Sequence, residues 1–144
     1  MIAHSIEIDR PANEVFAYLD QPERHGEWQD AIVHAHLETA GPVHVGTRVH
    51  EIRRFGRREQ DTSYEITVHE PPHRSAFRGI AGPVRPQGTV TVEPMGDSKS
   101  RVSIQFDLVG YGVGKLIAPL ARMQARKEVA ASQQHLKERL EEGA

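Results

Sequence analysis

Charged residues on one predicted strand are the strongest candidates for chemistry in this sequence. Residues 47–55 alternate so that Val49, Glu51 and Arg53 share one face, and the apolar Val49 indicates that this face points inward. A buried carboxylate could act as a general base or acid, and a buried guanidinium could hold a carboxylate or an enolate. The alternative is that Ile52 points inward, which would leave both charges in solvent.

Tyr64 lies on the next predicted strand, where Thr62, Tyr64 and Ile66 share one face. Its phenol could donate a proton or a hydrogen bond to a ligand oxygen, or close on a nearby backbone group. Together with Glu51 and Arg53, Tyr64 would orient a ligand in an otherwise apolar pocket. We therefore predict Glu51, Arg53 and Tyr64 as the catalytic residues, and Glu51→Gln is the substitution that would test this role.

The side chains that we expect to contact a ligand are mostly apolar and come from several segments. They are Trp28, Val49, Thr62, Ile66, Phe77, Val90, Phe106 and Tyr111. Trp28, the only tryptophan, lies in a polar segment, and it either packs against the C-terminal helix as a plug or lines the pocket entrance. Tyr111 stands between two glycines and is either a gate residue or an ordinary turn aromatic.

The nine histidines raise the question of a metal site. His34 and His36 share a strand face, as metal ligands can, but the alternating Val33 and Ala35 predict that both imidazoles point outward. His4 has the parity of three isoleucines, which favours a hydrogen-bonded core or edge residue over a catalytic one. No HExxH helix and no cysteine are present. We predict neither a metal nor a cofactor.

Composition favours a single domain over residues 1–144 and argues against nucleic acid as a partner. The formal net charge is -2, and no window is apolar enough to span a membrane. The arginine-rich run 53–58 is flanked by Glu51, Glu59 and Asp61, which favours a solvated hairpin over a phosphate-binding surface. Without a cysteine or a recognisable signal peptide, we expect a cytoplasmic monomer or homodimer.

Hydrophobic periodicity predicts the elements that position these residues. Period-two alternation predicts strands at 2–9, 33–37, 47–55, 58–70, 74–80, 89–93 and 101–109. Asp9 as a cap and Pro11 in the first turn predict a helix start, and residues 22–28 predict a second short helical turn. The glycines and prolines of residues 79–86 predict a loop.

The C-terminal segment predicts one long helix with a thin apolar stripe. The stripe consists of Ala118, Ala121, Ala125, Val129, Ser132, Leu136 and Leu140. Pro119 predicts a turn before it, so we expect the main helix after it, ending near Glu141. This helix is the only element large enough to cover the apolar face of the sheet. Because small residues on the helix oppose large ones on the sheet, we expect a cavity between them.

Several short runs along the chain have a common likeness. They are Ser5 to Phe16, Asp20 to Trp28, Val45 to Arg48, Glu70 to Pro72 and Leu136 to Leu140. Their order resembles START-like proteins of the SRPBCC superfamily, in particular the polyketide cyclase/dehydrase and lipid-transport group. The resemblance implies an α+β helix-grip fold. In that fold a seven-stranded curved antiparallel sheet wraps around a long C-terminal helix, two short helices follow the first strand, and a deep ligand cavity lies inside.

The resemblance implies function only broadly, because one fold serves many activities. The expected partner is a hydrophobic small molecule of polyketide, lipid or aromatic type. The chain could be a cofactor-free cyclase or dehydratase, in which the cavity folds the substrate and polar groups move protons. Alternatively, it could carry or sense a lipid or similar ligand without changing it. A protein-interaction module that uses the charged helix end, residues 137–142, is a third alternative.

Overall fold

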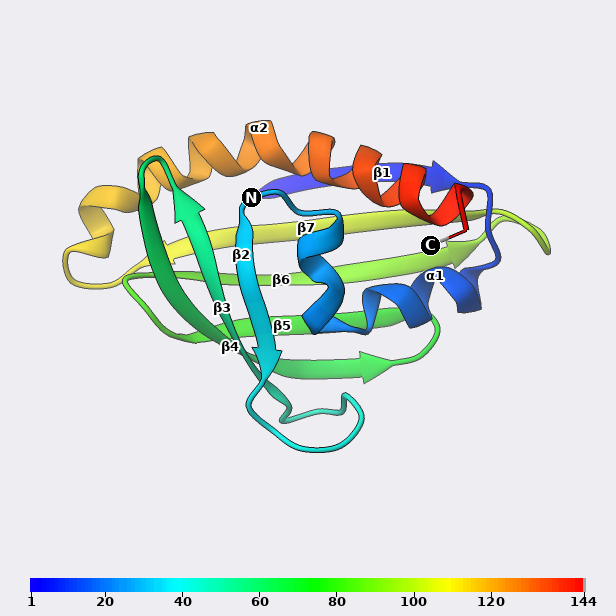
Figure 1. Cartoon of the computed structure of the whole chain (residues 1–144), viewed down its shortest axis with the longest axis horizontal. Coiled ribbons are helices and arrows are strands. Elements are labelled where there is room, and N and C mark those ends of the chain that lie inside the picture. Colours follow the sequence, from blue (N-terminus) through cyan, green and yellow to red (C-terminus); the bar gives the residue numbers. More distant parts are fainter. Residues whose placement is uncertain (144) are drawn as a thin grey trace.

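A seven-stranded antiparallel sheet in the order β1-β7-β6-β5-β4-β3-β2 forms the body of the molecule (Figure 1). The computed structural model describes residues 1–143. The strands are β1 (Ile2–Ile8), β2 (Ile32–Leu37), β3 (Arg48–Phe55), β4 (Arg58–Glu70), β5 (Arg74–Ala81), β6 (Val84–Pro94) and β7 (Ser100–Gly110). The helices are α1 (Ala12–Leu19), the 3-10 helix η1 (Pro22–Glu27) and α2 (Gly114–Glu141). The predicted helix-grip fold is confirmed.

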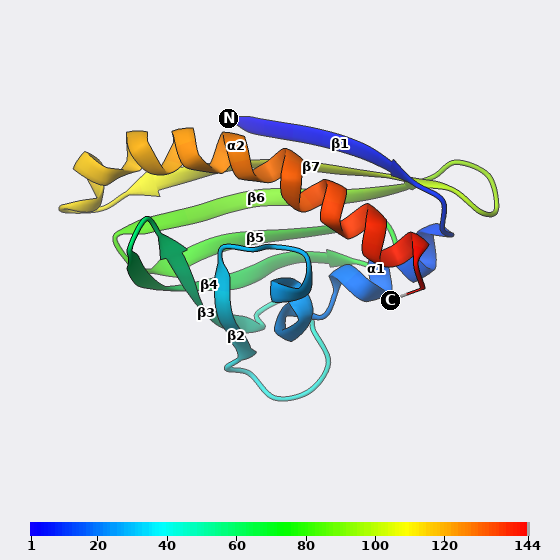
Figure 2. The ribbon, with the colours of Figure 1, turned by 45° about the horizontal axis from the view of Figure 1, so that its top comes forward.

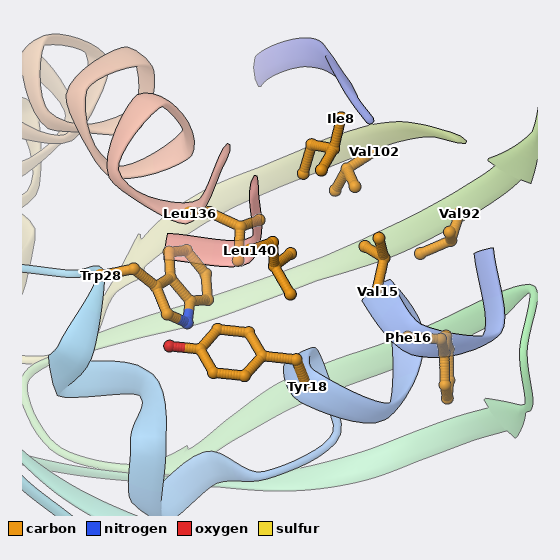
Figure 3. Close-up of a cluster of buried hydrophobic side chains, with 9 residues drawn as sticks. All are labelled: Ile8, Val15, Phe16, Tyr18, Trp28, Val92, Val102, Leu136 and Leu140. Atoms are coloured by element: carbon orange, nitrogen blue, oxygen red, sulfur yellow. The ribbon is translucent and has the colours of Figure 1, made fainter. Parts of the chain in front are cut away.

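The long helix α2 lies across the concave side of the curved sheet, and α1 and η1 lie near its C-terminal end (Figure 2). Near the C-terminal end of α2, the main hydrophobic core joins α1 and α2 to the sheet (Figure 3). Its buried members are Ile8, Val15, Phe16, Tyr18, Trp28, Val92, Val102, Leu136 and Leu140. The core therefore anchors α2 by its C-terminal half, and the large leucines of the predicted stripe make this contact.

The strong curl of the sheet depends on bulges and on a close approach at a glycine. Register shifts occur in the β2–β3 pairing and twice in the β4–β5 pairing. Gly88 of β6 faces Phe106 of β7, and a Cβ atom at Gly88 would lie 2.5 Å from the Phe106 Cβ and 2.3 Å from the Gln105 carbonyl oxygen. Bulges increase the local twist of a sheet, and glycine permits such a close approach.

Two local predictions near the turns are wrong. Most of the loop expected at residues 79–86 is strand, because β5 continues to Ala81 and β6 begins at Val84, which leaves residues 82–83 as the connection. Pro86 is tolerated there because the pairing of β6 with β5 ends at Gln87, so Pro86 lies where β6 pairs only with β7. Asp9 does not cap α1. Pro11 occupies the cap position without a side-chain bond, and the Asp9 backbone N–H donates to Glu141 at 2.9 Å.

The helix start and one strand parity also differ from the predictions. α2 begins at Gly114, and Pro119 lies inside it. The only helical bond lost is that to the Lys115 carbonyl, and both residues are exposed, so water can satisfy that oxygen. Val33 is 43% exposed rather than inward, because the bulge between Ile32 and His34 shifts the alternation.

Candidate functional site

A cavity of about 270 Å³ lies between α2 and the concave face of the sheet. The wall formed by β5, β6 and β7 is almost entirely apolar, and α2 contributes both apolar and polar residues. The apolar lining residues include Phe77, Val84, Pro86, Val90, Val102, Ile104, Phe106, Leu108, Ala121, Ala125 and Val129. The predicted thin stripe on α2 explains this space, because alanine and valine side chains are too short to fill the gap opposite phenylalanines.

The opposite wall carries the polar groups, and Arg53 of β3 is at their centre. Its Nε donates a hydrogen bond of 2.8 Å to Oε1 of Glu51. Its NH2 nitrogen donates one of 2.5 Å to Oε1 of Gln29, which follows η1. Glu51 is 3% exposed, which confirms the predicted inward parity of the strand. The guanidinium thus fixes the carboxylate and links β3 to the chain that leads into β2.

The electrostatics of the cavity favour the charged form of Arg53. Burial acts against the positive charge of Arg53, but the charge and the hydrogen bond of Glu51 outweigh it and raise the Arg53 pKa. Glu128 of α2 lines the same cavity and adds in the same direction. The Arg53 side chain keeps 36% of its accessible surface, although the residue lies deep inside the protein. That surface faces the cavity, where a ligand can reach it.

Tyr64 lies beside this pair on β4. It is opposite Val49 in the strand register, while Glu51 is opposite Thr62, so Tyr64 and Glu51 are diagonal neighbours on the inner face. Burial, and next the charge of Glu51, raise the Tyr64 pKa, so the phenol stays protonated at neutral pH. No residue within 1–143 shares a hydrogen bond with its hydroxyl, which leaves this group free to donate to a ligand oxygen.

Trp28 belongs to both the core and the cavity. It is 7% exposed and packs with Leu136 and Leu140 (Figure 3), yet its indole also lines the cavity. The His25 ring meets it edge-on at a centroid distance of 5.5 Å. The Trp28 Nε1 is buried without a hydrogen-bond partner among the described residues. The two predicted placements of Trp28, against the helix and along the pocket, therefore coincide.

Most of the other predicted ligand contacts line the cavity, and two do not. Those that line it are Thr62, Ile66, Phe77, Val90 and Phe106. Val49 is fully buried against Tyr64 and Ile66, behind the cavity wall. Tyr111 is 47% exposed at the surface, with the Arg85 guanidinium 3.9 Å above its ring. Neither is among the residues that line the cavity, so the structure offers no geometric support for Tyr111 as a gate.

The structure adds polar wall residues that the sequence analysis did not single out. These are Asp20, His25, Gln29, Gln60, Ser75, Gln124, Glu128 and Gln133. His25 donates from Nε2 to the Leu19 carbonyl at 2.7 Å, and burial lowers its pKa, so the ring is neutral at pH 7. Gln124 and Glu128 lie one helical turn apart beside the apolar stripe of α2. Their spacing in the sequence was the signal that could have placed them on the cavity wall.

The histidines form no metal site within the described part of the chain. No group of three or more potential ligands there could hold an ion. His34 and His36 are exposed, as predicted, and His4 hydrogen-bonds Gln133 of α2. His69 pairs with Asp20 at 2.9 Å and contacts the Phe16 ring. The register shift in β4 turns it towards α1.

The fold and the site define a helix-grip protein with an internal, largely apolar ligand cavity. Three similar solved structures show the same fold. The Zhui aromatase/cyclase from Streptomyces sp. R1128 has a TM-score of 0.79 at 11% identity, covering 94% of this chain and 89% of that one. A START superfamily protein from Mycobacterium smegmatis has a TM-score of 0.76 at 11% identity, covering 96% and 97%. The di-domain ARO/CYC BexL of the BE-7585A biosynthetic pathway has a TM-score of 0.74 at 17% identity.

The alignment with BexL covers 96% of this chain but only 45% of that one. The family model described as "Polyketide cyclase / dehydrase and lipid transport" matches residues 2–141. The chain therefore belongs to this family, as the resemblance implied. A search of curated proteins found no significant match. No helix within residues 1–143 is long and apolar enough to cross a membrane.

Proposed function

We propose that this protein binds a hydrophobic small molecule with one oxygen-bearing or anionic group inside the cavity. The observation that carries the proposal is the asymmetry of the cavity walls. Phe77, Phe106 and the small residues of α2 suit an aromatic, acyl or polyketide body. Arg53, Gln29 and Tyr64 supply hydrogen-bond donors and acceptors at one side, where the polar group of the ligand would lie.

A second candidate function, proton transfer on the bound molecule, is supported by Glu51 and Tyr64. The Glu51 carboxylate would remove a proton from the carbon next to a ligand carbonyl, and Arg53 would stabilise the enolate oxygen that forms. The protonated Tyr64 would then donate to an oxygen during ring closure or loss of water. These steps need no cofactor. They correspond to the cyclase or dehydratase activity in the family's name.

The binding proposal can be tested with two fluorescent naphthalene probes. The sulfonate of 1-anilinonaphthalene-8-sulfonate would contact Arg53, whereas N-phenyl-1-naphthylamine has the same apolar body without the anion. We expect Ala125→Phe, which fills the cavity, to abolish binding of both probes. Ala131→Phe is the matched control, because this residue lies on the exposed side of the same helix. Unchanged binding to Ala125→Phe would place the ligand elsewhere.

Arg53→Gln separates the polar anchor from the apolar walls. We expect it to weaken the sulfonate probe roughly tenfold, because a charge-assisted hydrogen bond is lost, and to leave the neutral probe nearly unaffected. An equal loss for both probes would mean that the substitution deforms the cavity and does not remove an anchor. This outcome would contradict the assigned role of Arg53.

Binding and catalysis are distinguished by the fate of the natural ligand. Native mass spectrometry of the purified protein would identify a retained molecule, which is then added back to the protein. A carrier returns the molecule unchanged. Conversion by the wild type that is lost in Glu51→Gln, with probe binding retained, would establish the proton-transfer function.

A further inference from the structure

The first turns of α2 carry a row of large apolar side chains that points away from the protein. The row consists of Val113, Leu116, Leu120 and Met123, which are 70%, 82%, 58% and 52% exposed. Their spacing of three, four and three residues places them on one helix face, which we call the α2 ridge. Ala118 and Ala121 are buried on the opposite side and hold the helix against the sheet. The ridge therefore contributes nothing to the core.

The charge around the ridge is uniformly positive. Residues 108–127 contain Lys115, Arg122, Arg126 and Lys127 and no acidic residue, although the whole chain has more acidic than basic residues. Arg122 pairs with Asp107 at 3.2 Å. The other three cations form no ion pair within residues 1–143. This stretch is therefore a local basic field on a molecule whose formal net charge is -2.

Two neighbouring turns extend this basic surface at the same end of the molecule (Figures 1 and 2). The Tyr111 backbone N–H donates to the Pro83 carbonyl at 2.9 Å, which joins the loop before α2 to the β5–β6 turn. Arg85 lies over the Tyr111 ring beside that turn. The β3–β4 hairpin places the exposed Arg57 and Arg58 at this end too, but the exposed Glu59 offsets one of these charges.

The cavity extends along α2 as far as the ridge. Gln124 of α2 lines the cavity and is also exposed to solvent. Gln124 directly follows Met123 of the ridge, so the apolar row lies beside this end of the cavity wall.

We propose that the α2 ridge docks on an anionic lipid bilayer and brings the neighbouring end of the cavity close to the membrane surface. A single convex row of leucine, valine and methionine has no groove into which a folded partner would fit. Acyl chains need no such shape, and the flanking lysines and arginines suit lipid phosphates. Docking of this kind is peripheral, in agreement with the absence of a spanning helix within residues 1–143.

The proposal goes beyond ligand binding, and either one can fail without the other. The test is co-sedimentation with phosphatidylcholine vesicles that contain about 30% phosphatidylglycerol, at low salt. We expect binding to fall roughly tenfold or more for the double variant Leu116→Ser, Leu120→Ser, because both inserted side chains are lost. We expect the wild type to lose a similar amount of binding on vesicles of pure phosphatidylcholine. We also expect the double variant Arg126→Gln, Lys127→Gln to lose a similar amount of binding on the anionic vesicles.

Matched variants show whether the effect belongs to this surface. Val33→Ser with Val45→Ser removes exposed apolar residues elsewhere, and Arg74→Gln with Lys99→Gln removes two cations elsewhere. Both should bind the anionic vesicles like the wild type. Equal binding of wild type and ridge variant would overturn the proposal. A wild type that stays in the supernatant but self-associates through the ridge in analytical ultracentrifugation would also overturn it, in favour of a second copy.

The cavity probes distinguish failure of the membrane-docking proposal from failure of the ligand-binding proposal. The ridge variants should bind N-phenyl-1-naphthylamine in solution like the wild type, because no ridge residue lines the cavity. Conversely, Ala125→Phe should lose the probe and keep vesicle binding. Loss of both properties in a ridge variant would indicate unfolding, so circular dichroism of each variant accompanies the assay, and Leu116→Gln replaces a variant that does not fold.

Discussion

At the scale of single residues, burial controls how the polar groups of the cavity behave. Arg53 keeps its charge inside the protein because the Glu51 carboxylate lies 2.8 Å from its Nε. Tyr64 has no such partner, and burial makes ionisation of its phenol unfavourable. One wall therefore holds a fixed ion pair next to a neutral donor, which is the arrangement that a ligand oxygen or a developing enolate would require.

The tyrosines give a direct test of this burial through pH. Burial raises the pKa values of both Tyr18 and Tyr64 above the ordinary value of 10.0. Above about pH 10 the unfolded chain therefore ionises these groups more readily than the native protein does. Stability from this source is complete below pH 10 and falls as the pH rises further, by up to about 1.4 kcal/mol per pH unit for Tyr64.

Absorbance at the tyrosinate band measures the effect. Near pH 11, unfolding by urea should increase the tyrosinate signal, with the largest part from Tyr64. Tyr64→Phe should remove most of this increase. If native Tyr64 ionised together with free tyrosine, the increase would be the same in wild type and variant, and the buried placement of the phenol would be wrong.

At the scale of the elements, strand β6 shows how a missing side chain shapes the sheet. Gly88 lets β6 and β7 approach closely in the middle of the curl, where Phe106 on the partner strand turns its ring into the cavity. A methyl group at Gly88 would overlap backbone as well as side-chain atoms. The strands would have to separate, and this would flatten the wall that faces α2.

We therefore expect Gly88→Ala to destabilise the protein by about 2–3 kcal/mol in urea denaturation. Gly26→Ala is the control, because its Cβ would meet no atom nearer than 3.6 Å. The control should change the free energy of unfolding by less than about 0.5 kcal/mol. Equal stability of the two variants would show that β6 and β7 can separate freely at this point.

At the scale of the whole molecule, the core and the cavity occupy different lengths of α2. Leu136 and Leu140 tie its C-terminal half to the core, whereas Ala125 and Val129 face empty space. The same helix thus serves as an anchor at one end and as a cavity wall at the other. Local stability should follow this division, because opening is easiest where few apolar contacts hold an element.

Hydrogen exchange would measure the division along α2. We expect amides of residues 120–129 to exchange roughly tenfold or more faster than those of residues 133–140 in the empty protein. Bound N-phenyl-1-naphthylamine should slow the first group and leave the second nearly unchanged. Uniform exchange along the helix, with or without the probe, would contradict the idea that the cavity leaves its N-terminal half weakly held.

Much of this architecture could be predicted from the sequence, because strand alternation and helix spacing are local properties. Alternation alone placed Glu51 and Tyr64 on inner faces, and the structure confirms both positions. The thin stripe on α2 predicted the cavity, since side-chain sizes are visible in the sequence. Short runs in the correct order predicted the helix-grip fold and the family.

Other features were decided only by the tertiary structure, because they depend on register and curvature between distant segments. Arg53 meets Gln29 only because the chain after η1 leads into β2 beside β3, and Trp28 joins the core only because α2 crosses at that point. A single bulge turned Val33 to solvent against its parity. Val49 points inward but lies behind the cavity wall. Strand alternation determines which face of the sheet a side chain is on, whereas the curl of the whole sheet determines whether that side chain reaches the cavity.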